Sequence, residues 1–231
     1  MARASAAVAP SPWTRAPAGR RDLAARKRDA VLRAAAQLFN ENGYHATSLD
    51  MVAERLSVTK PTLYYYVRSK EEILFECVRL GLELLRGAIT RAADSGGSAL
   101  DKLEAAMRQY ALIVTMDFGM CLIRVGEDPL TPDSRRRLRR LKGEIDHEFR
   151  ALIEQGVAEG SLAPCDPKLA AFTLAGALSW IARWYDSKGA YDIDTLAAEC
   201  VRFFLRTPSR SAVRRSATTS PRRAAKRRSP A

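Results

Sequence analysis

Two short helix signatures separated by one tight turn lie near the N-terminus, and they restrict the fold more than any other part of the chain. Ser48 is suited to cap the first helix and Thr59 the second, because a side-chain oxygen at this position accepts a hydrogen bond from a free backbone N–H. In the second helix only Leu63 and Val67 form a clear inward pair, at positions i and i+4. The segment therefore predicts a helix–turn–helix whose second helix buries little of its own surface.

The second of these helices carries polar and aromatic side chains that suit DNA. A helix–turn–helix places this helix in the major groove, with its N-terminal residues at the base edges. Lys60 can donate to guanine acceptors, and Thr62 can hydrogen-bond or touch a thymine methyl group. Tyrosine hydroxyls and lysine suit phosphate oxygens, which position a protein without reading sequence. The residues predicted to contact DNA are Thr47, Ser48, Thr59, Lys60, Pro61, Thr62, Tyr64, Tyr65 and Lys70, while Tyr66 either joins them or packs under the next helix.

Several motifs occur in order with the right gaps over residues 22–74. They are Val31-Leu32-x-Ala34-Ala35-x-x-Leu38-Phe39, Gly43-Tyr44-x-x-Thr47-Ser48 and Val58-Thr59-x-x-Thr62-Leu63-Tyr64-Tyr65-Tyr66-Val67. Together they resemble the N-terminal DNA-binding domain of the TetR family of bacterial regulators. The resemblance implies a dimeric, all-helical repressor with a ligand pocket in its C-terminal domain.

Two positions depart from the family pattern. Ser57 stands where the turn usually has glycine, so this turn must tolerate a β-carbon. Asp50 stands where some members carry a basic DNA-contacting residue, so no DNA contact is assigned to it.

The net charge of +12 is concentrated at the two ends of the chain. Residues 1–21 hold four arginines and no acid, and residues 207–231 hold eight lysines or arginines and no acid. These ends account for the whole net charge, so residues 22–206 are formally neutral. Basic ends add salt-sensitive affinity for polyanions but no choice of sequence.

The cysteine, histidine and glycine patterns argue against a metal site, a disulfide framework or an enzyme. The four cysteines stand far apart, with no Cys-x-x-Cys, which fits a reducing cytoplasm. Cys121 lies in an apolar stretch and is expected to be a small buried hydrophobe. No glycine-rich phosphate loop or nucleophile motif occurs, and no segment is apolar enough to span a membrane. We therefore expect a non-enzymatic, cytoplasmic bacterial protein without a cofactor, associated with the nucleoid when bound to DNA.

Helix start and stop signals along the sequence predict an all-α chain, with no alternating pattern typical of strands and no internal repeat. Ser69 with Glu72 reads as a capping box that opens a long helix ending near Asp94. A break is expected near Gly119, and Thr131-Pro132 and Asp166-Pro167 each give a cap followed by proline. The predicted domains are a disordered basic arm (1–21), an N-terminal three-helix DNA-binding domain with a helix–turn–helix (22–74), a helical ligand-binding and dimerisation domain (75–206) and a disordered basic tail (207–231).

The segment from Pro167 to about Ser187 is apolar on two sides, so it is expected to be buried on two sides. One side can close the core of the chain and the other can meet a partner, with small residues that permit close approach. The TetR resemblance implies that this helix and the last one build a dimer interface; the alternative is a large monomeric core. The predicted interface residues are Phe172, Ala175, Leu178, Trp184, Phe203 and Phe204.

Apolar and soft side chains of the central helices could line a ligand cavity, although each of them could equally be plain core. The predicted lining is Met107, Tyr110, Val114, Phe118, Cys121, Phe149 and Trp180. The string Trp180-Ile181-x-Arg183-Trp184-Tyr185-x-x-x-Gly189 resembles regulators of fatty-acid and sterol-ring degradation that answer to acyl-CoA thioesters. A basic run could meet a CoA phosphate or be a solvated helix face; it comprises Arg135, Arg136, Arg137, Arg139, Arg140 and Lys142.

These observations predict a sequence-specific transcriptional regulator that binds an operator in double-stranded DNA as a homodimer. We expect a repressor that a small apolar ligand releases, with an acyl-CoA thioester of lipid or sterol catabolism as the leading effector. The alternative is a general DNA-coating protein that works through its basic ends. The neutral middle of the chain and the well-formed second helix favour the regulator.

Overall fold

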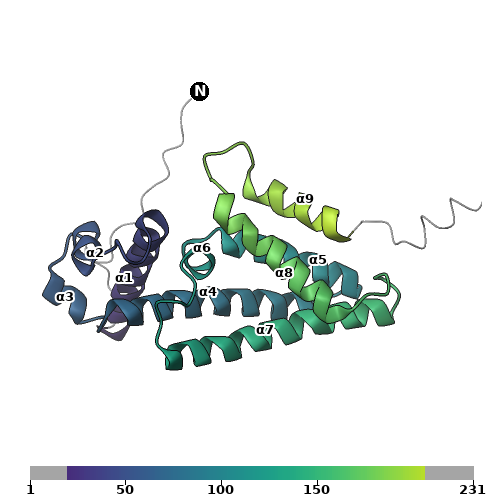
Figure 1. Ribbon diagram of the computed structural model, residues 1–231, viewed down its shortest axis with the longest axis horizontal. Coiled ribbons are helices and arrows are strands. Elements are labelled where there is room, and N and C mark those ends of the chain that lie inside the picture. Colours follow the sequence, from purple (N-terminus) through teal and green to yellow (C-terminus); the bar gives the residue numbers. More distant parts are fainter. Residues whose placement is uncertain (1–19, 206–231) are drawn as a thin grey trace, which may run out of the picture.

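The computed structural model describes residues 20–205, and within that range it is helical with no strand (Figure 1). The predicted arm and tail lie outside this range, except that Arg20 and Arg21 begin the first helix. The helices are α1 (Arg20–Asn42), α2 (Leu49–Arg55), α3 (Lys60–Tyr64), α4 (Lys70–Ala93), α5 (Ala99–Val114), α6 (Asp117–Arg124), α7 (Pro132–Ala158), α8 (Pro167–Trp184) and α9 (Ile193–Leu205).

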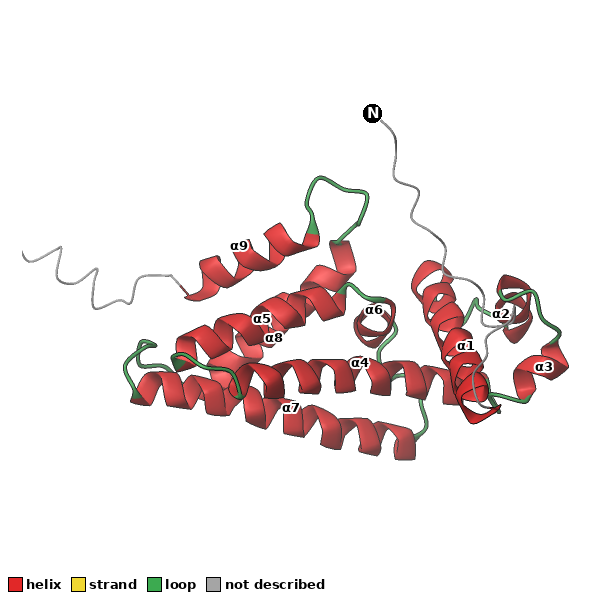
Figure 2. Cartoon of the chain, turned by 180° about the vertical axis from the view of Figure 1, so that it is seen from behind, coloured by secondary structure: helices red, strands yellow, loops and turns green. Residues whose placement is uncertain are grey.

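The helices form a small head at one end and a longer body (Figure 1). Helices α1, α2 and α3 make the head, and α4 runs from it along the length of the body, with α7 beside it. Seen from behind, α8 crosses the body and α9 lies at its outer edge (Figure 2). The predicted boundary between residues 74 and 75 falls inside α4, so one continuous helix connects the two parts.

Most of the predicted helix caps are present. Ser48 accepts a hydrogen bond from the Met51 N–H, and Thr131 and Asp166 cap α7 and α8 in the same way. Thr59 occupies the N-cap position of α3 as predicted, but its hydroxyl makes no capping bond, because it pairs with the Thr62 hydroxyl instead.

The predicted capping box of α4 is only half present. The Ser69 hydroxyl accepts from the Glu72 N–H, as expected. The Glu72 carboxylate, however, accepts from the backbone N–H of Arg68 at 2.7 Å rather than from that of Ser69. The carboxylate therefore ties down the chain one residue further from the helix than a capping box does.

The break predicted near Gly119 lies a few residues earlier, at Thr115 and Met116, and Gly119 sits inside α6. Residue 119 is glycine because of close packing and not because the chain bends there. A β-carbon on Gly119 would lie only 1.9 Å from the Ile113 carbonyl oxygen, and one on Gly81 would lie 2.8 Å from the Phe118 carbonyl oxygen. Glycine at both positions lets α6 pack directly against α4 and the end of α5.

Among residues 20–205, no helix combines the length and apolar composition needed to cross a bilayer. No group of three or more histidine, cysteine or acidic side chains in this range is arranged to hold a metal ion.

Candidate DNA-binding surface and ligand cavity

The N-terminal end of α3 presents Lys60, whose position depends on α2. The Lys60 ammonium lies 2.9 Å from the Asp50 carboxylate, and both side chains are well exposed. The hydrogen bond that Lys60 donates to Asp50 is the main reason that the pKa of Lys60 is raised above its ordinary value. Asp50 thus orients the Lys60 ammonium at the surface of the head.

The other residues predicted to contact DNA in and next to α3 are exposed, except that Thr62 is half-buried. The hydroxyls of Thr59 and Thr62 lie 2.8 Å apart and share a hydrogen bond, so the two side chains form one polar group beside the exposed Pro61. Tyr64 is 49 % exposed and Tyr65 is 80 % exposed. These large rings contribute little to the core of the head, which makes them available to a partner.

Tyr66 packs against the core and is not one of the exposed residues of the head. Its ring is half-buried against the core and meets the Tyr65 ring with centroids 5.1 Å apart. Leu63 and Val67 are fully buried, as the i,i+4 pattern predicted. The three consecutive tyrosines therefore divide into two exposed rings and one packing ring.

Thr47 must be corrected, because it is a structural residue rather than a surface group. It is 2 % exposed, and its hydroxyl faces the carbonyl oxygens of Leu38 at 3.1 Å and Gly43 at 2.9 Å. This contact closes the turn between α1 and α2. The neighbouring Ser48 stays exposed at the N-terminus of α2, where its hydroxyl also caps the helix.

Lys70, the first residue of α4, is held on the side of the head by two contacts. Its ammonium donates to the His45 carbonyl oxygen at 3.3 Å and lies 4.3 Å from the centre of the Tyr44 ring. Partial burial lowers the pKa of Lys70 below its ordinary value. The sequence did not reveal His45 and Tyr44 as partners, because they are about 25 residues away and the contact depends on how the turn folds.

The turn between α2 and α3 has left-handed backbone at Ser57, with φ of 54°. Glycine adopts this conformation without steric cost, whereas a β-carbon crowds the following carbonyl. The Ser57 N–H still bonds to the Glu54 carbonyl oxygen at 2.9 Å. The turn therefore forms as in a glycine-containing helix–turn–helix, with some strain.

A cavity of about 220 Å³ lies in the body between α4, α6, α7 and α8, with Tyr110 of α5 in its wall. Its lining is mostly apolar; the polar members are Tyr110, Ser179, Lys142 and Asp146. The Tyr110 and Ser179 hydroxyls lie 3.0 Å apart, and burial raises the pKa of the Tyr110 phenol. The full lining is Leu82, Leu85, Tyr110, Leu122, Ile123, Lys142, Ile145, Asp146, Phe149, Ala171, Phe172, Ala175 and Ser179.

The structure brings only two of the seven predicted lining residues, Tyr110 and Phe149, to this cavity; their rings lie 6.5 Å apart. The other five belong elsewhere. Met107, Val114 and Cys121 are fully buried core, and Phe118 packs at the junction of head and body beneath Arg33. Trp180 is 63 % exposed, because consecutive residues of a helix point in different directions and its neighbour Ser179 takes the side facing the cavity.

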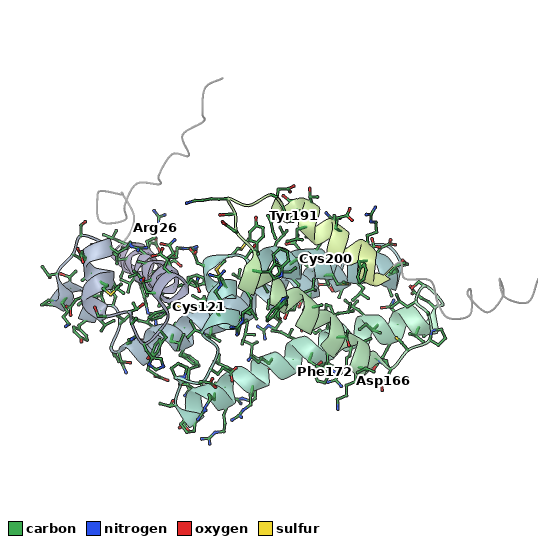
Figure 3. All side chains as sticks on the ribbon, turned by 45° about the horizontal axis from the view of Figure 1, so that its top comes forward. Arg26, Cys121, Asp166, Phe172, Tyr191 and Cys200 are labelled. Carbon is green, nitrogen blue, oxygen red and sulfur yellow. The ribbon has the colours of Figure 1, made fainter. Side chains whose placement is uncertain are left out.

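The outer face of α8 carries a row of exposed large apolar side chains. Phe172 is 54 %, Trp180 63 % and Trp184 47 % exposed, and they lie four or eight residues apart. Figure 3 shows Phe172 on the stretch of α8 that lies beside α7. Exposed apolar patches of this kind mark interaction sites.

The remaining predicted interface residues have different positions. Leu178 is fully buried inside the chain, so it belongs to the core and not to a partner-facing surface. Ala175 is half-buried and also lines the cavity. Phe203 is 74 % exposed on α9, whereas the side chain of Phe204 lies outside the described residues.

Comparison with known proteins assigns both parts of the chain. The family model described as bacterial regulatory proteins of the tetR family matches residues 31–77, and the one described as a tetracyclin repressor-like C-terminal domain matches residues 96–207. The chain belongs to the TetR family. Regulators of this family are DNA-binding proteins rather than enzymes, bind operator DNA as dimers and respond to small molecules.

Individual relatives agree with this assignment over most of their length. The HTH-type transcriptional repressor KstR2 of Rhodococcus jostii is 29 % identical over 78 % of this chain and 89 % of its own. The solved structure of the regulator PfmR from Thermus thermophilus is 30 % identical, with a TM-score of 0.71, over 76 % of this chain and 97 % of that one. The structure of AibR with isovaleryl coenzyme A and operator DNA is 26 % identical, with a TM-score of 0.69, over 76 % and 96 % of the two chains.

In this TetR-family regulator, α6 connects the cavity to the head. Leu122 and Ile123 of α6 line the cavity. At the other end of the helix, Asp117 accepts hydrogen bonds from Gln37 on its carboxylate and from Asn40 on its carbonyl, both at 2.9 Å. Helix α6 is therefore in direct contact with both the cavity and α1.

Proposed function

We propose that this TetR-family protein is a transcriptional repressor that an acyl-CoA thioester releases from its operator, in the bacterial cytoplasm and on the nucleoid when bound. Helix α3 enters the major groove, where Lys60 and Thr62 face the base edges. Tyr64, Tyr65 and Lys70 contact phosphates on either side. Two copies of α3 in a dimer read a pseudo-palindrome with half-sites about one turn of DNA apart, roughly 34–36 Å.

The dimer forms through the outer face of α8 together with α9. Phe172, Trp180 and Trp184 supply large apolar surface to a second copy, and Gly176 between them permits close approach of the partner helix. Phe172 and Ala175 belong to this face and also to the cavity lining. Ligand and partner therefore share a wall, which gives the ligand a means of favouring one dimer arrangement.

The observation that carries the proposal is the apolar cavity bordered by α4, α6, α7 and α8, with the hydrogen-bonded hydroxyls of Tyr110 and Ser179 in its wall. Its volume of about 220 Å³ lies below the roughly 300–1,000 Å³ typical of sites for drug-sized ligands. Such a space suits a short or medium acyl chain, with the hydroxyl pair available to a thioester carbonyl. AibR, which binds isovaleryl coenzyme A in its solved complex, supports this ligand class.

The ligand acts by favouring one setting of α4 and α6. It shifts the equilibrium only by its differential affinity for the two dimer shapes, typically about 1–3 kcal/mol of coupling. By linkage, operator DNA weakens ligand binding by the same factor. The release of DNA by the ligand and the weakening of ligand binding by DNA therefore both measure the same coupling free energy.

The test is a titration of acyl-CoAs of increasing chain length against a complex of the protein with its operator. Free CoA and the matching free fatty acids are the controls. We expect the thioesters alone to release DNA, with short and medium chains more effective than long ones because of the cavity volume. If none of the three ligand classes releases DNA while the dimer stays intact, the proposal is wrong and the cavity is only a packing gap.

A further inference from the structure

We propose that Arg135, Arg139 and Lys142 of α7 form a strip that binds the phosphate groups of the effector outside the cavity. The proposal rests on the proposed function and extends it by assigning the site of the CoA end of the ligand. It follows from the geometry of one helix face, from the distribution of charge on that face and from the size of the cavity.

The three basic residues lie on the helix face that lines the cavity. Lys142 and Asp146 both belong to the cavity wall. Arg139 and Arg135 precede Lys142 by three and seven residues, so they lie on the same face of α7. At 1.5 Å per residue, the strip extends about 10 Å beyond the cavity, toward the N-terminal end of the helix.

Two of the three basic residues of the strip, Arg135 and Arg139, carry positive charge that no described residue neutralises. Lys142 pairs with Glu127 at 2.5 Å, and Asp146 pairs with Arg150. By contrast, the guanidinium groups of Arg135 and Arg139 make no ion pair and no side-chain hydrogen bond to any residue in the range 20–205. Two guanidinium groups beside an apolar opening suit phosphate oxygens, which they can bind through two parallel hydrogen bonds.

The cavity itself excludes the phosphates. Its volume of about 220 Å³ holds part of an acyl-CoA at most, and its wall is formed mainly by leucine, isoleucine, alanine and phenylalanine side chains. Burying a phosphate among such groups would be strongly unfavourable. A ligand with its acyl end inside must therefore leave its charged end at the solvent-exposed edge of the cavity. Lys142 and Phe172 are the exposed residues of the lining, and the strip begins at Lys142.

DNA is the other polyanion that an arginine strip could bind. The hydroxyls of Thr131 and Ser134, just before the strip, donate hydrogen bonds to Glu71 in the first turn of α4, so the strip begins near the head. We favour the coenzyme because the strip continues the cavity wall, whereas the exposed groups of the head lie on α3. The experiment separates the two.

Two double variants of the full-length protein provide the test. R135A/R139A removes both arginines of the strip. R137A/R140A is the matched control, because it removes the same charge from positions of the same helix that are turned away from Lys142, where neither arginine has an ion pair among the described residues. Arg139 borders the same surface depression as the control pair, whereas Arg135 does not. The ligands are hexanoyl-CoA, CoA itself and the hexanoyl thioester of N-acetylcysteamine, which lacks phosphates. Calorimetry gives each dissociation constant, and a DNA-binding titration gives operator affinity at several salt concentrations.

We expect R135A/R139A to weaken binding of hexanoyl-CoA and CoA about tenfold, which is the loss expected from removing charge-assisted hydrogen bonds. Binding of the N-acetylcysteamine thioester should not change, and R137A/R140A should bind all three ligands as the unmodified protein does. Equal losses in both double variants, or no loss in either, would overturn the proposal. A loss of ligand-free operator affinity with a smaller salt dependence, confined to R135A/R139A, would assign the strip to DNA instead.

Failure of the strip and failure of the proposed function give different results. If hexanoyl-CoA releases the operator from both double variants with unchanged affinity, the function stands and the strip is wrong. If CoA binding depends on Arg135 and Arg139 but no thioester releases DNA, the strip stands and the function is wrong. If neither CoA nor hexanoyl-CoA binds the unmodified protein, both are wrong.

Discussion

Two tyrosines show how differently the head and the body of this molecule are built. Tyr65 in the head, directly after α3, is 80 % exposed, and its ring meets that of its neighbour Tyr66. Tyr110 in α5 is 8 % exposed and shares a hydrogen bond with Ser179 beside a cavity. The head presents its candidate DNA-contacting groups at the surface, whereas the body arranges its polar pair beside an apolar cavity.

The difference has a consequence for regulation. Helix α4 is continuous between the head and the body, and α6 of the body contacts α1 of the head through Asp117. Under the proposed function, a ligand in the body acts on the head through these packed elements. Substitutions in the head, the body and the junction between them test this division, from the largest expected effect to the smallest.

Loss of the dimer should have the largest effect on operator binding. Replacing Trp180 and Trp184 together by aspartate puts charges into the apolar row of α8, and we expect a monomer at micromolar concentration. Operator affinity should fall by about 100-fold or more, because in a monomer the binding of one head no longer holds a second head near the other half-site. Light scattering gives the mass, and Leu84→Asp on α4 is the control for an exposed apolar residue away from this face. A monomeric variant with unchanged operator affinity would contradict the dimer.

Gly119→Ala tests the close packing of α6 at the base of the head. The added β-carbon has no room beside the Ile113 carbonyl oxygen, so we expect a loss of about 2–4 kcal/mol in the free energy of unfolding. Gly143→Ala on α7 is the matched control, since nothing lies within 4 Å of its added β-carbon. That control should gain up to about 1 kcal/mol from the better helix propensity of alanine. Urea unfolding of both variants checks the prediction, and similar values for the two would show that α6 is not tightly packed.

Lys60→Ala and Lys70→Ala separate reading of bases from holding of phosphates. Loss of Lys60 should cost about 1–3 kcal/mol of operator affinity and relax preference at one position. Loss of Lys70 should weaken binding to all sequences alike and lower the salt slope by about one unit. Binding titrations on operator and random DNA at several salt concentrations measure both. The same uniform loss in both variants would remove the assigned difference between the two lysines.

Ser57→Gly should have the smallest effect and the opposite sign. Glycine relieves the left-handed strain at φ of 54°, so we expect the free energy of unfolding to rise by about 0.5–1 kcal/mol. Thermal unfolding checks it, with Ser187→Gly in the turn after α8 as a control, because Ser187 is exposed and has no left-handed backbone. A lower stability of the variant with glycine in the turn would mean that the Ser57 side chain makes a compensating contact.

The sequence predicted the head far better than the body, because the important contacts of the head join residues that are close together in sequence. Caps such as Ser48, the inward pair Leu63 and Val67, and the strained turn at Ser57 all depend on residues within a few positions of each other. The two failures in the head, Thr47 and the cap at Thr59, arose because a hydroxyl has several local partners and sequence does not rank them.

The cavity depends on contacts between residues far apart in sequence. Leu82, Tyr110, Phe149 and Ser179 meet only because four helices pack around them. Apolar periodicity identified Tyr110 and Phe149 as inward-facing but does not distinguish a cavity wall from packed core, which is why Met107, Val114 and Cys121 were included. Trp180 was included because α8 is apolar on both sides, and periodicity does not say which side faces inward.

The most direct test of the central claim is the sequence specificity of the protein with and without its basic ends. An operator can be selected from random DNA, and its affinity relative to unrelated DNA compared between the full chain and a version limited to residues 20–206. We predict that the shortened protein loses nonspecific, salt-sensitive affinity but keeps its preference for the operator, because α3 reads the sequence. Loss of operator preference together with the basic ends would contradict the account and would favour a protein that coats DNA through those ends.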